Sequence, residues 1–414
     1  MHHAEAHATG GSARRPQLQD PLVPQGEPEM LSTPAEVAAF LDHIRAVGSF
    51  AYDTEFIGEE TFLPRICLVQ LATSERIGLV DPLALPEDSM RRVWKAVCDP
   101  TLQTLVHAGG QDVLIAQRGA GDSAASVIDT QIAAGMTGMP WPLSLGNLVE
   151  SLTGVHLPKG HTFTEWDKRP LSKAQIGYAA DDVRFLPLVW AKQRERLDAL
   201  GRTAWVIEET REATRQSEDF DPQSQVRRAA RGLTLRPREL TVLRELVLVR
   251  QEMAQALNLP PRTALPDSCM LDLARMGTPT ADRIAQLRGI PRSTLQHFQR
   301  NIENTMTRAR ALPPEQDAQW APRPESAEQR TQVDALWSIV SMRSIALGIA
   351  APLVTSRAEL AGWFLSDRND RPHLFPAGSW RQESIGSWLE AFLRGERHLN
   401  LRWHDGGPTA DVSG

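Results

Sequence analysis

The sequence predicts an α/β domain, built as a mixed sheet with flanking helices, followed by two all-α helical domains. Short strand-like runs alternate with helical periodicity up to about residue 212, and only helical periodicity continues beyond it. The 414 residues are also enough for two or three domains, each with its own core. We therefore expect the α/β domain at residues 30–212 and the helical domains at residues 235–312 and 329–404.

The remaining segments are expected to be ends and connections. Residues 1–29 have almost no apolar periodicity, which predicts a disordered leader. Residues 213–234, which include a polar and acidic stretch, and residues 313–328, which are rich in proline, are expected to be linkers. Residues 405–414 are expected to form a frayed tail.

The first helix of the α/β domain has a complete start signal. Thr33 can act as the N-cap, Pro34 suits the first helical position, and Glu36 at the third position completes a capping box. One apolar stripe follows, made of Val37, Phe40, Leu41 and Ile44. A helix from about residue 34 is therefore predicted.

Strands and helices then alternate along the chain. Apolar and β-branched runs predict strands at residues 50–56, 65–71, 76–80, 104–107 and 127–129. The first three follow one another directly, which indicates an antiparallel meander. Helical periodicity predicts helices at residues 90–97 and 111–117 and one that opens near Ser172. A mixed sheet covered by helices is the architecture that this order favours.

Composition excludes several classes of protein. The three cysteines are too few and too widely spaced for a disulfide framework or a zinc cluster; they are Cys67, Cys98 and Cys269. No apolar run approaches the roughly 20 residues of a membrane span, and the N-terminus lacks a signal-peptide pattern. We therefore expect a cytoplasmic protein with no membrane association and no obligate protein partner.

The net charge of −6 conceals a basic middle of the chain. Residues 226–310 contain fifteen arginines and seven acids, a local charge of +8, so the rest of the chain sums to −14. No lysine follows Lys192, and arginine favours planar recognition of phosphate. The same usage can equally reflect genomic base composition.

Asp53 and Glu55 stand two positions apart on the first predicted strand. This spacing turns both carboxylates to one face, where burial is costly unless a positive charge lies between them. A divalent metal ion is the simplest such charge. The alternative at this point is a pair of solvated acids at the edge of the sheet, and only partner carboxylates elsewhere in the chain can decide between the two.

Three further side chains can complete a metal site. Asp112 falls in the first turn of the helix at 111–117, and Tyr178 and Asp182 lie one helical turn apart. Four carboxylates from separate elements can hold two divalent ions about 4 Å apart, an arrangement that promotes phosphoryl transfer. Oxygen ligands favour magnesium or manganese over zinc. The tyrosine hydroxyl can then orient an attacking water.

This ordered set resembles the ribonuclease D family of DEDD-type 3′-to-5′ exonucleases, in the subgroup with a Tyr-x-x-x-Asp third motif. The three motifs correspond to residues 53–56, 107–112 and 178–182. Residues 128–134, and Trp166 with Arg169, Pro170 and Leu171, also resemble the family pattern. The resemblance implies a ribonuclease-H-like fold.

The resemblance also implies a role for each residue of the site. Asp53 would be shared by two Mg²⁺ or Mn²⁺ ions, Glu55 and Asp182 would bind the ion that activates water, and Asp112 would bind the other. Tyr178 would position the nucleophile. Asp181 competes with Asp182 for this role, and the three-residue gap of the family motif selects Asp182. Asp129 is interpreted as an N-cap or supporting acid instead of a ligand.

Contacts with RNA are expected on two parts of the chain. Residues 235–312 resemble the helicase-and-ribonuclease-D C-terminal (HRDC) domain, a small nucleic-acid-binding module, and the second bundle resembles a diverged copy. The densest arginine cluster begins just before the first of them. The side chains expected to contact RNA are Phe56, His107, Lys159, Arg169, Arg227, Arg228 and Arg231. For each charged one, the alternative is a solvated surface position.

The activity implied is metal-dependent 3′-to-5′ trimming of RNA with a free 3′ end, with transfer-RNA precursors as substrates and nucleoside 5′-monophosphates as products. A DNA-directed exonuclease of the same superfamily would carry the same motifs, because recognition of the 2′-hydroxyl is not visible in sequence. A non-catalytic RNA-binding protein is the other alternative, and it would be expected to lack at least one of the acids.

Overall fold

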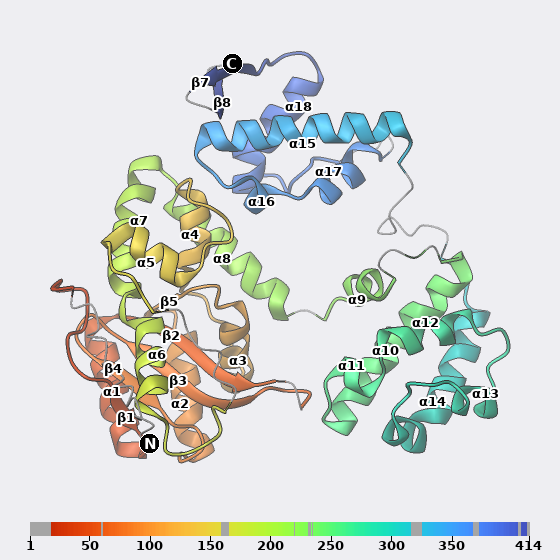
Figure 1. The fold of residues 1–414 in the computed structure, drawn as a ribbon, viewed down its shortest axis with the longest axis horizontal. Coiled ribbons are helices and arrows are strands. Elements are labelled where there is room, and N and C mark those ends of the chain that lie inside the picture. The colour runs from red at the N-terminus through yellow and green to blue at the C-terminus, as the bar shows by residue number, and fades with distance from the viewer. Residues whose placement is uncertain are drawn as a thin grey trace, which may run out of the picture.

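The computed structural model describes residues 18–58, 61–158, 165–218, 220–230, 233, 235–315, 325–366, 372–404 and 407–411. These residues form an α/β unit (residues 18–218), a middle unit (residues 220–315) and a C-terminal unit (residues 325–411). Figure 1 shows the C-terminal unit above the α/β unit, the middle unit to one side, and helix α8 extending from the α/β unit toward helix α9.

The α/β unit is built on a mixed six-stranded sheet in the order β1-β4-β3-β2-β5-β6. Its strands are β1 (Glu29–Leu31), β2 (Ser49–Ile57), β3 (Arg65–Ala72), β4 (Ile77–Val80), β5 (Gln103–Val106) and β6 (Val127–Asp129). Strand β2 pairs antiparallel with β3 and parallel with β5. The meander β2-β3-β4 and the mixed sheet confirm the fold class predicted from the alternation of short runs.

Alternate residues of β2 contribute to different parts of the core, because side chains of a strand point to opposite faces in turn. Phe50 and Tyr52 belong to one buried cluster, which includes Ile44. Ala51 belongs to another, on the opposite face of the sheet. Asp53 follows Ala51 by two positions and therefore lies on the face of Ala51.

Eight helices of the α/β unit cover the sheet: α1 (Pro34–Val47), α2 (Glu87–Cys98), α3 (Gly110–Ala120), α4 (Thr130–Met136), α5 (Leu145–Thr153), α6 (Lys173–Arg184), α7 (Leu186–Leu200) and α8 (Thr203–Glu218). The predicted start of α1 is confirmed, since Thr33 and Glu36 form the capping box. Its apolar stripe is buried as expected. Among the described residues, no helix combines the length and apolar character that a membrane span requires.

The middle unit consists of α9 (Pro222–Ala229), α10 (Pro237–Leu257), α11 (Pro261–Ala264), α12 (Asp267–Arg275), α13 (Ala281–Ala285) and α14 (Arg292–Ala311), with a core of its own. The prediction of a linker at residues 213–234 is wrong, because most of this segment is helical. Asp221 caps α9 through the N–H groups of Gln223 and Ser224, and Val226 and Ala229 are buried in the core of the middle unit. Spacing of three residues puts these two apolar side chains on one helical face.

The C-terminal unit contains α15 (Ala327–Leu347), α16 (Ala351–Val354), α17 (Arg357–Phe364), the π-helical turn η1 (Gln382–Gly386), α18 (Ser387–Leu393), and the strands β7 (Asn400–His404) and β8 (Gly407–Asp411). The two strands pair antiparallel. The prediction of an all-α second bundle with a frayed tail is therefore wrong at its end, where antiparallel backbone pairing stabilises β7 and β8.

The C-terminal unit packs directly on the α/β unit. Both contribute to one hydrophobic cluster, and Trp205 of α8 stacks on Trp380 with 5.8 Å between ring centroids. Arg202 donates to the carbonyl oxygen of Met136 at 2.9 Å and to that of Gly348 at 3.1 Å. The two units therefore share a core as well as polar contacts.

The described part of the chain before β1 packs on the α/β unit, whereas a disordered leader was predicted there. Residues 1–17 lie outside the described residues, but Leu18, Leu22 and Val23 pack against the cluster that includes Leu148 and Val189. Three apolar side chains within six positions supply enough burial to hold this segment on the domain.

Candidate active site

The central strand β2 carries two acids, of which Asp53 lines a small pocket. Asp53 and Glu55 are partly buried, and the β2–β3 register shifts between Glu55 and Phe56. Such an irregularity bends a strand and redirects the side chains beside it. The pocket has a volume of about 150 Å³ and is lined by Tyr52, Asp53, His107, Leu145, Tyr178, Asp182 and Leu186.

Asp112 is held against β2 from the first turn of α3. The Tyr52 hydroxyl donates to the backbone carbonyl of Asp112 at 2.9 Å, and the Thr54 hydroxyl donates to its carboxylate. Neither Tyr52 nor Thr54 was singled out from the sequence. Two features of the sequence could have indicated Tyr52. It is one of only two tyrosines in the chain, and it directly precedes Asp53, on the opposite face of the strand.

Helix α6 brings the third motif to the pocket. Ser172 and Gln175 form a capping box at its start. This box fixes where the helix begins, and thereby which face of the helix carries Tyr178. The structure places Asp182 on the pocket, while Asp181 pairs with Arg184 at 3.4 Å. The geometry thus favours Asp182 over Asp181, as the spacing predicted.

Burial and neighbouring acids raise the pKa values of the two carboxylates on β2. Burial, followed by the charges of Asp112 and Asp182, raises the pKa of Asp53 well above its usual value. Burial and the charges of Asp182 and Asp112 raise the pKa of Glu55 to about 8. These four acids, although they come from β2, α3 and α6, are therefore close enough to interact.

Hydrogen bonds oppose this effect at two of the acids. Burial raises the pKa of Asp112 to about 6 against the bond from Thr54, which lowers it. Burial and the charge of Asp181 raise the pKa of Asp182 to about 7, against the bond from Tyr178. Burial and the nearby charge of Asp182 also raise the pKa of the Tyr178 phenol, so this phenol stays protonated at neutral pH.

The chemistry of the acids fits divalent cations. Four hard oxygen ligands that disfavour one another's charge are stabilised by a cation between them. Gln70 lies opposite Asp53 in the β2–β3 register; it is fully buried, and its amide atoms have no hydrogen-bond partner among the described residues. Within the same part of the chain, no three acidic, histidine or cysteine side chains already have the spacing of ligands to one ion.

His107 and Asp129 support the second motif. The ring of His107 lies 3.0 Å from the Thr130 hydroxyl through Nδ1 and 2.9 Å from the Leu143 carbonyl through Nε2, and burial lowers its pKa. Asp129 caps α4 by accepting from the N–H of Gln131, which confirms its interpretation as an N-cap.

The residues expected to contact RNA near the site have different surroundings. Phe56 is partly buried beside the β2 irregularity. The Arg169 guanidinium is held by Asp81 at 2.6 and 2.7 Å and by the carbonyl of Cys67 at 2.7 Å. These bonds favour a structural role for Arg169 over the contact with RNA that the sequence predicted. Lys159 lies outside the described residues.

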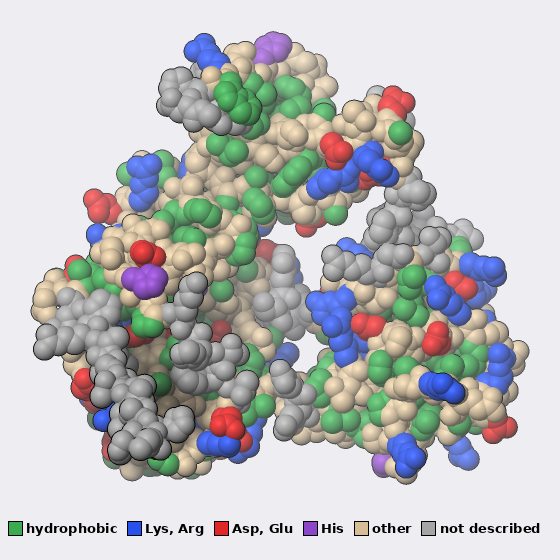
Figure 2. All heavy atoms as spheres, in the orientation of Figure 1, with side chains coloured by type: hydrophobic (Ala, Val, Ile, Leu, Met, Phe, Trp, Pro, Cys, Tyr) green, Lys and Arg blue, Asp and Glu red, His purple; other side chains and the backbone are tan. Residues whose placement is uncertain are grey.

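The arginine cluster lies on the middle unit, away from the pocket. Arg227 and Arg228 are exposed on α9, and Arg227 lies 3.6 Å from Asp221. Arg231 lies outside the described residues. Figure 2 shows arginine side chains, in blue, spread over the visible face of the middle unit and interspersed with a smaller number of acids. Neither described arginine lines the pocket.

Comparison with known proteins agrees with this arrangement. A family model described as 3′-5′ exonuclease matches residues 28–198, and the HRDC domain model matches residues 239–302. Ribonuclease D from Granulibacter bethesdensis is 32% identical over 384 residues, covering 90% of this chain and 94% of the relative. Ribonuclease D from Gluconacetobacter diazotrophicus is 31% identical over 381 residues, covering 91% and 95%.

Solved structures match over a similar extent. The crystal structure of Escherichia coli RNase D has a TM-score of 0.72 at 26% identity, covering 89% of this chain and 99% of that chain. A protein from Bifidobacterium adolescentis has the same fold, with a TM-score of 0.61 at 22% identity.

The ribonuclease-H-like sheet and the acids at its centre define a 3′-to-5′ exonuclease. With relatives above 30% identity along nearly its whole length, the chain belongs to the ribonuclease D family and is an exoribonuclease.

Proposed function

We propose that this enzyme trims RNA 3′ ends by two-metal-ion phosphodiester hydrolysis with Mg²⁺ or Mn²⁺. The observation that carries the proposal is that acids from β2, α3 and α6 lie close together, so that Asp112 and Asp182 raise the pKa values of both Asp53 and Glu55. In this proposal Asp53 is shared by both ions, Glu55 and Asp182 hold one, and Asp112 holds the other. Bound ions would supply charge neutralisation and a lowered pKa for water.

The protein's own groups orient the reaction. Tyr178 is protonated and donates to Asp182, so its oxygen keeps lone pairs that can accept from an attacking water. Thr54 and Tyr52 fix the carboxylate and the backbone of Asp112. Leu145 and Leu186 add apolar side chains to the pocket wall. The site is therefore preorganised before RNA binds.

The test is a pair of substitutions on neighbouring residues. Asp182→Asn removes a proposed ligand and is expected to abolish turnover of a 5′-labelled RNA, while Asp181→Asn, which changes the same charge one position away, is expected to keep a near wild-type rate. Asp53→Asn should also abolish turnover and leave RNA binding intact. Activity lost in EDTA and restored by Mn²⁺ completes the test. Wild-type rates for Asp182→Asn or Asp53→Asn would refute the site assignment.

Transfer-RNA precursors are the proposed substrates. The Escherichia coli relative is described as an exoribonuclease involved in structured RNA processing, and a middle unit that matches the HRDC domain offers a basic surface for a folded RNA. A tailed transfer-RNA precursor with its 3′ hydroxyl free should be shortened, and the same RNA with a blocked 3′ end should not. Equal digestion of both would refute the polarity.

The DNA-directed alternative is tested by the same design. Single strands of RNA and DNA with identical sequence are digested side by side, and faster loss of the RNA is expected.

The second bundle is proposed to be a diverged HRDC-like module. The cytoplasm is the proposed location of the protein, because all three cysteines are free and buried.

A further inference from the structure

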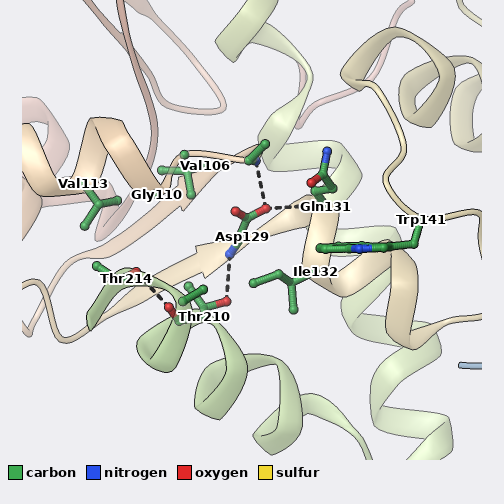
Figure 3. A pocket seen from close by; sticks show the side chains of 12 residues that line it. Val106, Gly110, Val113, Asp129, Gln131, Ile132, Trp141, Thr210 and Thr214 are labelled. Atoms are coloured by element: carbon green, nitrogen blue, oxygen red, sulfur yellow. Dashed lines mark hydrogen bonds between the residues drawn. The ribbon is translucent and has the colours of Figure 1, made fainter. Parts of the chain in front are cut away.

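A chain of hydrogen bonds leads from the second motif to helix α8. Oδ1 of Asp129 accepts from the backbone N–H of Ala108 at 3.0 Å and from that of Gln131 at 2.8 Å. The backbone N–H of Asp129 donates to the hydroxyl of Thr210, on α8, at 3.2 Å. Figure 3 shows Asp129 between these groups, beside a cavity of about 200 Å³ that Trp141 also lines.

The turn that Asp129 holds has an unfavourable backbone. Ala108 has a φ of 55°, a left-handed conformation that is unfavourable for a residue with a Cβ. It is followed by Gly109, where an added Cβ would lie 2.5 Å from Cβ of Val106. Asp112 comes directly after this turn, in the first helical turn of α3. The position of Asp112 therefore depends on this turn as well as on the bonds from Tyr52 and Thr54.

Helix α8 connects the same turn to the C-terminal unit. Glu209, next to Thr210, accepts from the indole N–H of Trp380 at 2.9 Å and from Arg381 at 2.6 Å. Thus two consecutive residues of α8 contact different partners, one the docked unit and the other Asp129. A displacement of α8 would therefore alter the hydrogen bond between Thr210 and Asp129.

We propose that Asp129 and Thr210 are positioning residues, which hold the turn at Ala108 and so place Asp112 for metal binding. This inference rests on the proposed role of Asp112 as a ligand. In this role Asp129 acts through one acceptor oxygen, because the N–H bonds from Ala108 and Gln131 both end on Oδ1, and an amide in its place keeps that oxygen. The neighbouring cavity leaves room for the amide nitrogen.

The first test compares Asp129→Ala with Asp129→Asn. The alanine variant loses the acceptor for Ala108, and its Mn²⁺ binding, measured by isothermal titration calorimetry without RNA, is expected to weaken about 10-fold to 100-fold. Its kcat should fall by a similar factor with KM for RNA unchanged. The asparagine variant should keep both quantities within a few-fold of wild type. Thermal unfolding establishes that each variant is folded at the assay temperature.

The second test uses two threonines of α8 that are one turn apart. Thr210→Val removes the hydroxyl that accepts from Asp129 and should weaken Mn²⁺ binding several-fold. Thr214→Val is the matched control, because among the described residues its hydroxyl donates only to the carbonyl of Thr210, at 2.8 Å. It lines the same cavity and should leave Mn²⁺ binding unchanged.

The outcomes separate this inference from the proposed function. Wild-type Mn²⁺ binding and kcat in Asp129→Ala would overturn the inference, and so would an Asp129→Asn variant as impaired as the alanine one, since the charge of Asp129 would then be needed. Equal effects of Thr210→Val and Thr214→Val would overturn the role of Thr210. A wild-type enzyme that neither binds nor requires a divalent ion would refute the proposed function instead.

Discussion

Replacement of Arg169 by alanine should destabilise the α/β unit and leave RNA affinity unchanged. The sequence placed Arg169 among the expected RNA contacts, whereas the structure surrounds its guanidinium with acceptors. Besides the two bonds to Asp81 and one to Cys67, it donates to the carbonyl of Trp166 at 2.8 Å and to that of Lys168 at 2.9 Å. Every edge of the guanidinium is thus occupied within the protein.

The size of the effect follows from burial of the pair. The side chain of Asp81 is 9% exposed and that of Arg169 is 26% exposed. Removing one partner of a buried pair costs about 3–5 kcal/mol because a charge is left without compensation. Water can reach Asp81 from the arginine side, so we expect the lower end, about 3 kcal/mol. Arg169→Lys should lose less, since a lysine keeps the charge but not the two parallel bonds.

Urea unfolding followed by circular dichroism measures this change, and KM for a single-stranded RNA is measured under conditions where the variant is folded. Arg45→Ala is the matched control: its pair with Asp42 is exposed, at 54% and 75%, and its loss should change stability by less than about 0.5 kcal/mol. A stable Arg169→Ala protein with a raised KM would refute the structural role and support an RNA contact.

The same pair predicts a dependence of stability on pH. Burial would raise the pKa of Asp81, but the hydrogen bonds and charge of Arg169 outweigh burial and lower it. The stabilisation is therefore fully present above the unfolded pKa of about 3.9 and is lost as pH falls through the lower folded value. The stability difference between wild type and Arg169→Ala should be constant from pH 5 to 7 and shrink below about pH 4. A difference that grows on acidification would contradict this sign.

Two further predictions concern packing. Trp380→Ala removes a side chain that is 1% exposed and should lower the free energy of unfolding by about 3–5 kcal/mol. It should also enlarge the radius of gyration measured by X-ray scattering. Trp403→Ala is the control, because Trp403 is 76% exposed, and it should change neither quantity. Gly109→Ala places a Cβ against Val106 and should lower kcat and cost about 1–3 kcal/mol, whereas Gly146→Ala, with open space around it, should be silent in the same assays.

Local patterns in the sequence were sufficient for most of the α/β unit. The capping box at Thr33 and Glu36, the strand ending at Asp129 and the helix opening after Ser172 are all set by residues within a few positions of one another. Their periods of 2 and 3.6 also determine which side chains share a face. The faces of Asp53, and of Tyr178 with Asp182, followed from these periods alone.

Segments rich in polar residues were harder to predict. Residues 222–229 and 407–411 were assigned to a linker and a tail, yet they form α9 and β8. Each has few apolar residues, and its structure is stabilised by contact with a neighbouring element: α9 by the core of the middle unit and β8 by pairing with β7. Local propensity is a weak guide where tertiary contacts decide.

The sequence by itself determined the order of the acids, the elements that carry them and the family to which they point. Only the tertiary structure decided which side chains hold those acids in place. Arg169 meets Asp81 across 88 positions, and Trp380 meets Glu209 across 171. Such partners are brought together by the packing of separate elements, and no periodicity within a short stretch of sequence records that packing.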